Sequence, residues 1–252
     1  MKSILSALLT ALLNLQFWIF APLLTAIFAL IAVPYAVAFN YTVRDRRRTL
    51  RLIRRSISYY GAMIVRCGWP LVRVRYVDHA PDETPPFVFA SNHRSSSDAF
   101  LMGCLPFECI QALNIWPSRL WVVGRVGRIA GYLKVREMPF EQFLDDGSKL
   151  LAEGCSIIVF PEGTRSGSRR LGPFHGAAFR LAQQCGVKVV PIAICGNERI
   201  PPRGSLLLRP GRIVVNKLPA ITPSQYAGMT PFKLKNLVRD AIRQHLDNQS
   251  GV

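Results

Sequence analysis

The amino-terminal part of the chain is a long apolar stretch, because no charged residue occurs from Ser3 to Val43. As a helix that rises about 1.5 Å per residue, this stretch is long enough to cross a hydrocarbon core of about 30 Å twice. Two polar residues and two prolines interrupt it, namely Asn14, Gln16, Pro22 and Pro34. We therefore predict that residues 1–43 form a membrane anchor.

The hydrophobic pattern leaves the form of this anchor open. One form is a single tilted helix that crosses the membrane around residues 17–39. Another is a helical hairpin that turns near Asn14 to Pro22. A cleaved signal peptide would suit Lys2 and the first apolar residues. We disfavour it because the hydrophobicity continues well past the usual cleavage zone.

A strongly basic segment follows the anchor, with seven arginines from Arg44 to Arg55. Arginines directly after an apolar span mark the cytoplasmic side of a membrane. Near an anionic surface each basic residue also contributes roughly 1 kcal/mol to binding. We predict a basic amphipathic helix on the membrane surface over residues 44–68; the alternative is a solvated face that only fixes the topology. Residues 69–252 are then expected to form a cytoplasmic domain.

Beyond residue 70, apolar runs with the period of strands alternate with segments of helical period. Strands are expected at 71–77, 87–90, 120–123, 133–135, 156–160, 187–194 and 212–215. Helices are expected at 98–103, 140–153, 174–185 and 231–246. The alternation predicts an α/β fold, in which a mostly parallel or mixed sheet is flanked by helices and preceded by the apolar membrane helix or hairpin.

The composition narrows the classes of function. The 252 residues carry a net charge of +17, the pI is near 10.4, and half of the residues are apolar. Such a chain suits an anionic membrane surface or an anionic substrate. Nucleic acid is disfavoured, because aromatic residues are not interleaved with the basic ones and no zinc-finger spacing occurs. None of the six cysteines forms a C-x-x-C pair, so the sequence indicates neither a structural zinc site nor a redox pair. We also expect no metal and no cofactor.

The first candidate chemistry lies where the apolar run from Phe87 to Ala90 ends. His93 follows this run, and Asp98 comes five positions later, after a group of serines. Serine hydroxyls satisfy free backbone N–H groups at helix starts, so we expect a strand-to-helix corner here. At such a corner the carboxylate can hold one imidazole nitrogen and leave the other facing a cleft. The pair is a base supported by an acid, without an obvious protein nucleophile beside it.

Two common motifs are absent from the sequence. The G-x-S-x-G elbow of serine hydrolases does not occur, which disfavours a hydrolase or thioesterase. The G-x-x-x-x-G-K-[ST] phosphate loop does not occur either, so any phosphate binding must rest on other residues.

Four blocks occur in a fixed order along the domain. The first reads N-H-R-S-S-S-D from Asn92 to Asp98, and the second runs from Gly131 to Arg136. The third reads F-P-E-G-T-R-S from Phe160 to Ser166, and the fourth reads V-P-I-A-I from Val190 to Ile194. In these blocks and in their order, residues 70–220 resemble the PlsC-like glycerolphosphate and lysophosphatidate acyltransferase family.

The resemblance implies that the first block is catalytic. His93 would be the general base that activates an acceptor hydroxyl, and Asp98 would fix the tautomer of the imidazole and stabilise its protonated form. A thioester donor is already activated, so this chemistry needs a base and no covalent enzyme nucleophile. Three further residues are candidates for the acyl or catalytic pocket, namely Asn92, Ser95 and Pro191.

The resemblance also implies that the third block binds the glycerol phosphate of the acceptor. Its candidate residues are Glu162, Gly163, Thr164 and Arg165. The guanidinium of Arg165 matches a phosphate with two parallel hydrogen bonds, and Glu162 would orient Arg165 or a substrate hydroxyl. Arg136 would be a second phosphate contact. The second block departs from the family pattern, since it is one residue shorter and has Lys134 where an apolar residue is usual.

The sequence therefore predicts a membrane-bound O-acyltransferase. It would move a fatty acyl group from acyl-CoA or acyl carrier protein to the free hydroxyl of a lysophospholipid, with lysophosphatidate as the leading acceptor and phosphatidate as the product. Because the second block is altered, another lysolipid such as lyso-ornithine lipid is an alternative acceptor. A non-catalytic protein of the membrane surface is the alternative from another class. The expected location is the inner membrane, with the catalytic domain facing the cytoplasm.

Overall fold

The structure, a computed structural model, describes residues 2–113, 127, 129–135, 137–166, 168, 170–198, 200–202 and 204–249. The chain forms two compact units. The anchor unit contains residues 1–75, 95–106 and 196–213, and the core unit contains residues 76–94, 107–195 and 214–252. The units are thus built from alternating parts of the chain. The division into an anchor over residues 1–43, a surface helix over 44–68 and a domain over 69–252 stays a prediction.

The anchor unit begins with one continuous helix, α1, which spans Lys2–Val43 and contains Pro22 and Pro34. The helix does not turn between Asn14 and Pro22, so the hairpin form expected there is not what the chain adopts. Neither proline is accompanied by a glycine or a run of short polar residues that would reverse the chain. Of the described helices, α1 is the one long and apolar enough to cross a membrane.

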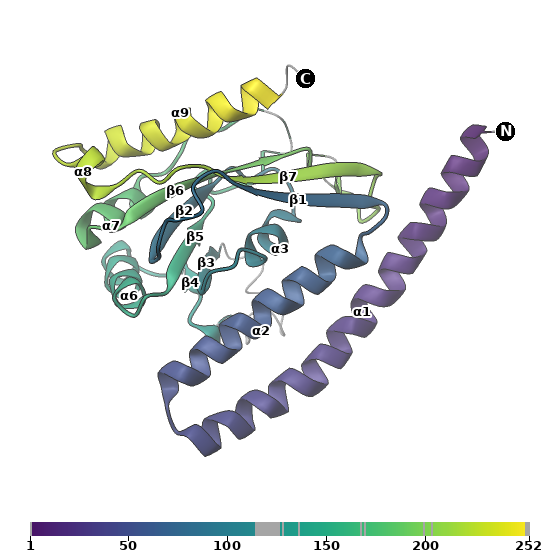
Figure 1. The fold of residues 1–252 in the computed structure, drawn as a ribbon, viewed down its shortest axis with the longest axis horizontal. Coiled ribbons are helices and arrows are strands. Elements are labelled where there is room, and N and C mark those ends of the chain that lie inside the picture. Colours follow the sequence, from purple (N-terminus) through teal and green to yellow (C-terminus); the bar gives the residue numbers. More distant parts are fainter. Residues whose placement is uncertain are drawn as a thin grey trace. The chain divides into compact units, whose positions relative to one another are not determined.

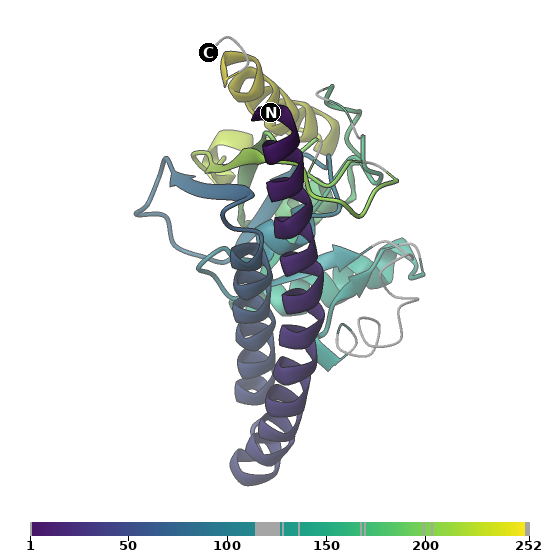
Figure 2. The ribbon, with the colours of Figure 1, turned by 90° about the vertical axis from the view of Figure 1, so that its right-hand side faces the viewer.

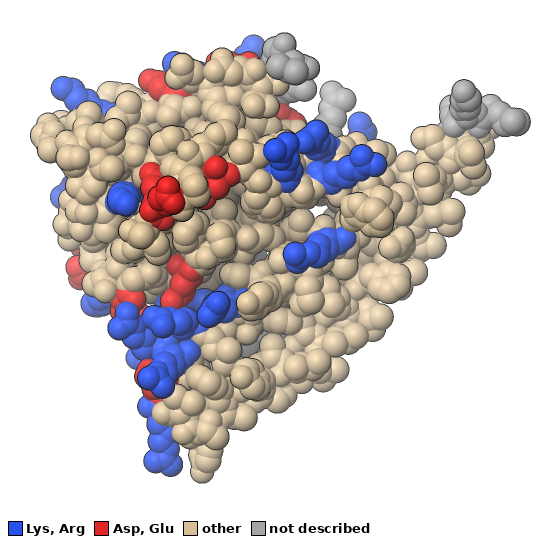
Figure 3. Space-filling model, in the orientation of Figure 1, with Lys and Arg blue, Asp and Glu red and all other residues tan. Residues whose placement is uncertain are grey.

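The second helix, α2, spans Arg46–Cys67 and follows a sharp turn. Arg44 adopts a positive φ of 52°, and Asp45 caps α2 by accepting a hydrogen bond from the backbone N–H of Arg48 at 3.1 Å. Figure 2 shows α1 and α2 running alongside each other. In the face drawn in Figure 3, basic side chains gather around the part of the molecule where α2 begins.

Side chains join the two long helices at one polar and one aromatic contact. The Oγ1 atom of Thr25 lies 2.9 Å from the hydroxyl of Tyr60, and the rings of Phe28 and Tyr60 are 5.1 Å apart. The short helix α3, Asp98–Gly103, packs on α2 at Gly61, where a Cβ would lie 3.5 Å from the carbonyl oxygen of Phe100. The small residue permits this close approach.

In the described residues, seven strands form one sheet in the order β1-β7-β6-β2-β5-β3-β4. The strands are β1 Val72–Asp78, β2 Phe87–Ser91, β3 Cys109–Leu113, β4 Leu133–Lys134, β5 Ser156–Val159, β6 Lys188–Cys195 and β7 Gly211–Lys217. The central strand β2 is parallel to both neighbours, β5 and β6, whereas β6 and β7 are antiparallel. The sheet is therefore mixed, as predicted from the alternating pattern.

Helices α6 (Phe140–Ala152), α7 (Ala177–Cys185) and α9 (Pro231–Gln249) cover one face of the sheet (Figure 1). Their buried apolar side chains form one core with those of the strands. The pattern did not predict β3 or the short helix α8, Pro223–Tyr226. The strand expected at 120–123 lies outside the described residues. The predicted α/β class, with helices flanking the sheet, is confirmed.

Candidate active site

The first block begins where β2 ends, in the core unit. Asn92 is completely buried, and its amide exchanges two hydrogen bonds with the main chain of Ile194 in β6. Its Nδ2 donates to Ile194 O at 2.9 Å, and its Oδ1 accepts from Ile194 N at 2.8 Å. Asn92 therefore fixes the end of β2 to the neighbouring strand. This is a scaffold contact, and a role of Asn92 in the acyl or catalytic pocket stays a prediction.

His93 is half-buried, and its ring stacks on the ring of Phe160 with a centroid distance of 4.3 Å. The strands explain this neighbourhood, because β2 and β5 are adjacent and parallel, with Ala90 paired to Val159. Residues that follow these two strands emerge at the same edge of the sheet. The carboxyl edge of such a sheet is where α/β proteins place their binding residues.

Glu162 links the main chain of His93 to a second loop. Its Oε1 accepts a hydrogen bond from the backbone N–H of His93 at 2.7 Å, and its Oε2 accepts from Gly172 N at 2.8 Å. The carbonyl oxygen of His93 in turn accepts from Ser166 N at 2.8 Å. The third block thus holds His93 from both sides of its peptide backbone. Glu162 is buried, with 9% of its surface exposed, and these contacts were not foreseen for it.

The remaining residues of the third block differ in exposure. Gly163 has a φ of 71°, and a Cβ there would lie 3.2 Å from the ring of His175, so both conformation and space favour glycine. Thr164 and Arg165 are exposed. Their side chains are therefore accessible from solvent, as binding of a phosphate group would require.

Two further candidates have different outcomes. Pro191 is buried within β6, where it pairs with Ala90 of β2, next to the first block. Arg136, the expected second phosphate contact, lies outside the described residues. Its neighbour in the second block, Lys134, forms an ion pair with Glu137 at 2.8 Å.

Asp98 lies in the anchor unit and is completely buried. Its Oδ2 accepts a hydrogen bond from the backbone N–H of Ser95 at 2.9 Å, and its Oδ1 accepts one from Nδ2 of Asn197. His93 belongs to the core unit, since the boundary between the units falls after Arg94. The structure thus describes the surroundings of the two residues separately, and the pairing of their side chains stays a prediction from their spacing.

The serine hydroxyls do not act as expected at the start of α3. Ser97 occupies the N-cap position without a side-chain capping bond. The hydroxyls of Ser95 and Ser97 instead both donate to the carbonyl oxygen of Ile200, each at 2.9 Å. Of the predicted caps, Ser95 Oγ keeps a contact of 3.3 Å with the backbone N–H of Ser97. The two hydroxyls thus link the start of α3 to the chain segment that contains Ile200.

Sequence reasoning missed Asn197 and Gly172. Asn197 follows the fourth block by three residues, and a polar residue directly after a buried strand was an available signal. Gly172 contacts Glu162 through its backbone N–H, and no side-chain pattern reveals such a contact.

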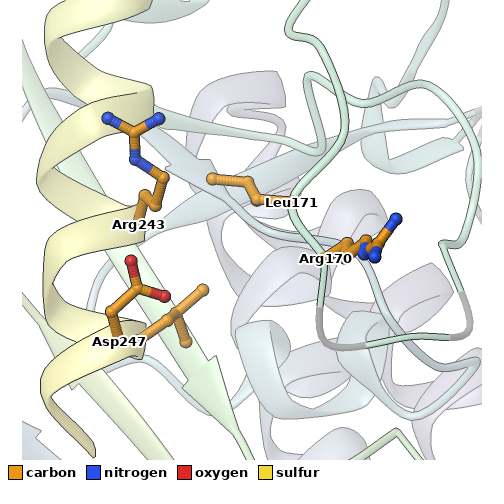
Figure 4. A pocket seen from close by; sticks show the side chains of 5 residues that line it. Arg170, Leu171, Arg243 and Asp247 are labelled. Atoms are coloured by element: carbon orange, nitrogen blue, oxygen red, sulfur yellow. The ribbon is translucent and has the colours of Figure 1, made fainter. Parts of the chain in front are cut away.

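A pocket of about 400 Å³ lies beside the loop that contains Gly172. It is lined by Arg170, Leu171, Arg243, Leu246 and Asp247. In Figure 4 the side chain of Leu171 points toward α9, whereas the guanidinium of Arg170 points away from that helix. The pocket contains none of the predicted site residues. Within the described ranges, no three His, Cys, Asp or Glu side chains are grouped to hold a metal ion.

Comparison with known proteins identifies relatives of the chain. A model of the family described as Acyltransferase matches residues 72–195. The chloroplastic 1-acyl-sn-glycerol-3-phosphate acyltransferase BAT2 of Brassica napus is 34% identical over 194 residues, which cover 73% of this chain and 53% of the relative. The 1-acyl-sn-glycerol-3-phosphate acyltransferase alpha of Mus musculus is 29% identical over 227 residues, which cover 86% and 74% of the two chains. The chain spans about half the length of the Brassica napus protein and of a related Arabidopsis thaliana protein.

A solved structure has the same fold. The crystal structure of the 1-acyl-sn-glycerophosphate (LPA) acyltransferase PlsC from Thermotoga maritima superposes with a TM-score of 0.77 at 19% identity, covering 98% of both chains. The likeness thus includes the N-terminal helices as well as the sheet. The matching family model, the relatives and the four ordered blocks show that the chain belongs to the PlsC-like acyltransferase family.

Proposed function

We propose that the chain is a membrane-bound O-acyltransferase that transfers a fatty acyl group to the free hydroxyl of lysophosphatidate, which yields phosphatidate. The donor would be acyl-CoA or acyl carrier protein. The names of the relatives support the acceptor, since they are 1-acyl-sn-glycerol-3-phosphate acyltransferases. One observation carries the proposed chemistry. At the carboxyl edge of the sheet, the F-P-E-G-T-R-S block forms hydrogen bonds with both the backbone N–H and the backbone carbonyl oxygen of His93.

In the proposed reaction His93 is the general base. The imidazole takes the proton from the acceptor hydroxyl as the oxygen attacks the thioester carbonyl. The thiolate then leaves as the tetrahedral intermediate collapses, and the imidazolium returns the proton to it. An imidazole can both accept and return a proton, which suits it to such transfers. Asp98 would hold the second ring nitrogen, so that the base is always in the correct tautomer.

The third block is proposed to bind the acceptor phosphate. Arg165 is exposed, and its guanidinium can form two parallel hydrogen bonds with a phosphate. The positive φ of Gly163 and its missing side chain let the main chain approach a ligand closely. Arg136 remains a proposed second phosphate contact. Because the second block departs from the family pattern, another lysolipid such as lyso-ornithine lipid remains the alternative acceptor.

The proposed location is the inner membrane. Helix α1 would insert into the bilayer, and the arginines at the start of α2 would lie among anionic headgroups on the cytoplasmic side. The acceptor is itself a membrane lipid, so an enzyme held at the membrane meets its substrate in two dimensions.

The proposal is tested with the purified full-length chain, a panel of lysolipids and both donor types, with mass spectrometry of the products. We expect the wild-type protein to acylate lysophosphatidate. His93→Ala should lower the rate of acyl transfer by about 10²–10⁴-fold. The same fraction of this variant as of the wild type should be recovered with the membranes. Preferential acylation of lyso-ornithine lipid would show that this lipid, and not lysophosphatidate, is the acceptor. Equal transfer by wild type and His93→Ala would overturn the assignment of the base. Transfer to no lysolipid would favour the non-catalytic alternative.

A further inference from the structure

The segment that follows β6 connects two distant parts of the anchor unit. Residues 196–210 run from the end of β6 to the start of β7. Near its beginning this segment contacts Asp98, and near its end it contacts Asn14 in the first third of the apolar helix α1. All three parts belong to the same compact unit. The segment therefore ties the acidic residue of the first block to the proposed membrane anchor.

At the first end, Asn197 and Asp98 are both completely buried. The amide Nδ2 of Asn197 donates to Oδ1 of Asp98. The reverse orientation of this amide would place two oxygens against each other in a site without solvent, which fixes the amide nitrogen toward the carboxylate. The carbonyl oxygen of Ile200, three residues farther on, receives the hydroxyls of Ser95 and Ser97. The start of α3 is thus connected to this segment at two points, Asn197 and Ile200.

At the other end, Asn14 of α1 is buried, although most of the helix around it is exposed. Its Nδ2 donates to Leu208 O at 2.9 Å, and its Oδ1 accepts from Leu208 N at 2.7 Å. The indole Nε1 of Trp18, one turn farther along α1, donates to Leu206 O at 3.1 Å. A polar amide in an apolar helix is costly unless it is paired, and here the segment pairs both of its groups.

The backbone conformation at the point where the segment leaves β6 is also fixed. Gly196 has a φ of 83°, and a Cβ at this position would collide with the carbonyl oxygen of Arg212. The main chains of residues 196 and 212 are therefore in direct contact. The segment leaves β6 in one conformation, which directs Asn197 toward Asp98.

We propose that Asn197 is a positioning residue for acyl transfer that acts through the carboxylate of Asp98, and that Asn14 supports it by anchoring the same segment to α1. This inference rests on the proposed function of Asp98 as the partner of the base. The amide of Asn197 and the N–H of Ser95 hold one carboxylate oxygen each, so the plane of the carboxylate is set. A carboxylate that is free to rotate would hold an imidazole less well.

The first test is a double-mutant cycle on the purified full-length protein. We expect Asn197→Ala to lower kcat by about 10- to 100-fold, which is the range for a hydrogen bond to a charged group, with the acceptor KM unchanged. In an Asp98→Ala background, Asn197→Ala should have no further effect. A residue with a merely structural role would lower the rate in both backgrounds. Equal losses in both backgrounds, or no loss in either, would overturn the proposal.

The second test uses α1. Asn14→Leu removes both hydrogen bonds to Leu208 and keeps the helix apolar, and we expect kcat to fall about 2- to 10-fold. Asn40→Leu is the matched control, since Asn40 is exposed near the end of the same helix. Both variants should remain in the membrane fraction after carbonate extraction. If Asn14→Leu transfers acyl groups as fast as Asn40→Leu, the anchoring role is wrong. A wild-type protein without activity would instead refute the proposed function itself.

Discussion

The Oε1 atom of Glu162 accepts a hydrogen bond from the backbone N–H of His93 at 2.7 Å. The same carboxylate accepts the N–H of Gly172 through its other oxygen at 2.8 Å. One acidic side chain therefore joins the loop of the proposed base to the loop that follows the third block. Two backbone donors on a buried carboxylate are charge-assisted bonds, so this junction is strong.

Glu162→Gln should weaken that junction. The amide has one acceptor oxygen and one NH2 group, so one of the two backbone N–H groups would face another donor. We expect kcat to fall about 10- to 100-fold with the acceptor KM unchanged, in steady-state acyl transfer. Glu141→Gln, on the exposed surface of α6, is the control. A rise in the acceptor KM instead would show that Glu162 contacts the substrate directly.

Arg165→Ala should chiefly impair binding of the acceptor. We expect the KM for lysophosphatidate to rise by about 10- to 100-fold, because a charge-assisted contact to the phosphate is lost, whereas the KM for the acyl donor stays the same. Arg170→Ala is the matched control, as an exposed arginine of the same loop. If only the KM for the acyl donor rises, residues other than Arg165 bind the phosphate of the acceptor.

Asn92→Ala should destabilise the core unit. The substitution leaves the N–H and C=O groups of Ile194 without their partners in a fully buried position. Each buried group that loses its partner costs about 1–3 kcal/mol, so for two groups we expect the unfolding free energy to fall by about 2–6 kcal/mol. Thermal unfolding in detergent, with the exposed Asn248→Ala as reference, measures the change. A melting temperature equal to that of the reference would contradict the scaffold role.

Acid should destabilise the protein through His245. Burial lowers the pKa of His245, and the nearby His79, whose ring centroid lies 5.4 Å away, lowers it further. In the unfolded chain an imidazole has its ordinary pKa near 6.5, so below about pH 6.5 the unfolded state binds the proton more readily than the folded state. Stability from this residue is therefore complete above about pH 6.5 and falls as the pH drops toward the folded pKa.

The measurement is the melting temperature at about pH 7.5 and about pH 5.5. His245→Phe keeps an aromatic ring but does not titrate, and it should reduce the difference between the two temperatures. Among the described residues, Nε2 of His245 is buried without a hydrogen-bond partner, so the ring contributes mainly by packing. An unchanged difference in His245→Phe would assign the acid sensitivity to another group.

The strands and the order of the blocks could be predicted from the sequence, because each depends on residues that are close together in the chain. The run Phe87–Ala90 is buried on both faces of a central strand, so it is apolar at every position. The short strand β3 was missed because Gln111 interrupts its apolar run. The continuity of α1 through Pro22 could not be predicted either. A proline in an apolar run either ends a helix or is tolerated within it, depending on the neighbouring residues.

The contacts that hold the site could not be read from the sequence, because they are backbone hydrogen bonds between distant segments. Glu162 was expected near Arg165 or a substrate hydroxyl, yet its oxygens are occupied by main-chain N–H groups of His93 and Gly172. The serines looked like helix caps, yet Ile200 lies 105 residues after Ser95 and provides the acceptor. Spacing identifies which residue types are available, and tertiary structure decides which partners they meet.

Helix α9 supports the loop around Glu162 from the far end of the sequence. Arg239 donates to Gly172 O at 2.9 Å and to Leu171 O at 3.1 Å, and it is made 67 residues after Gly172. During synthesis on the ribosome, α1 emerges well before Arg239. A nascent chain can therefore present its apolar helix to a membrane well before the loop that holds His93 has its full set of hydrogen bonds. Insertion of the proposed anchor would thus precede completion of the site.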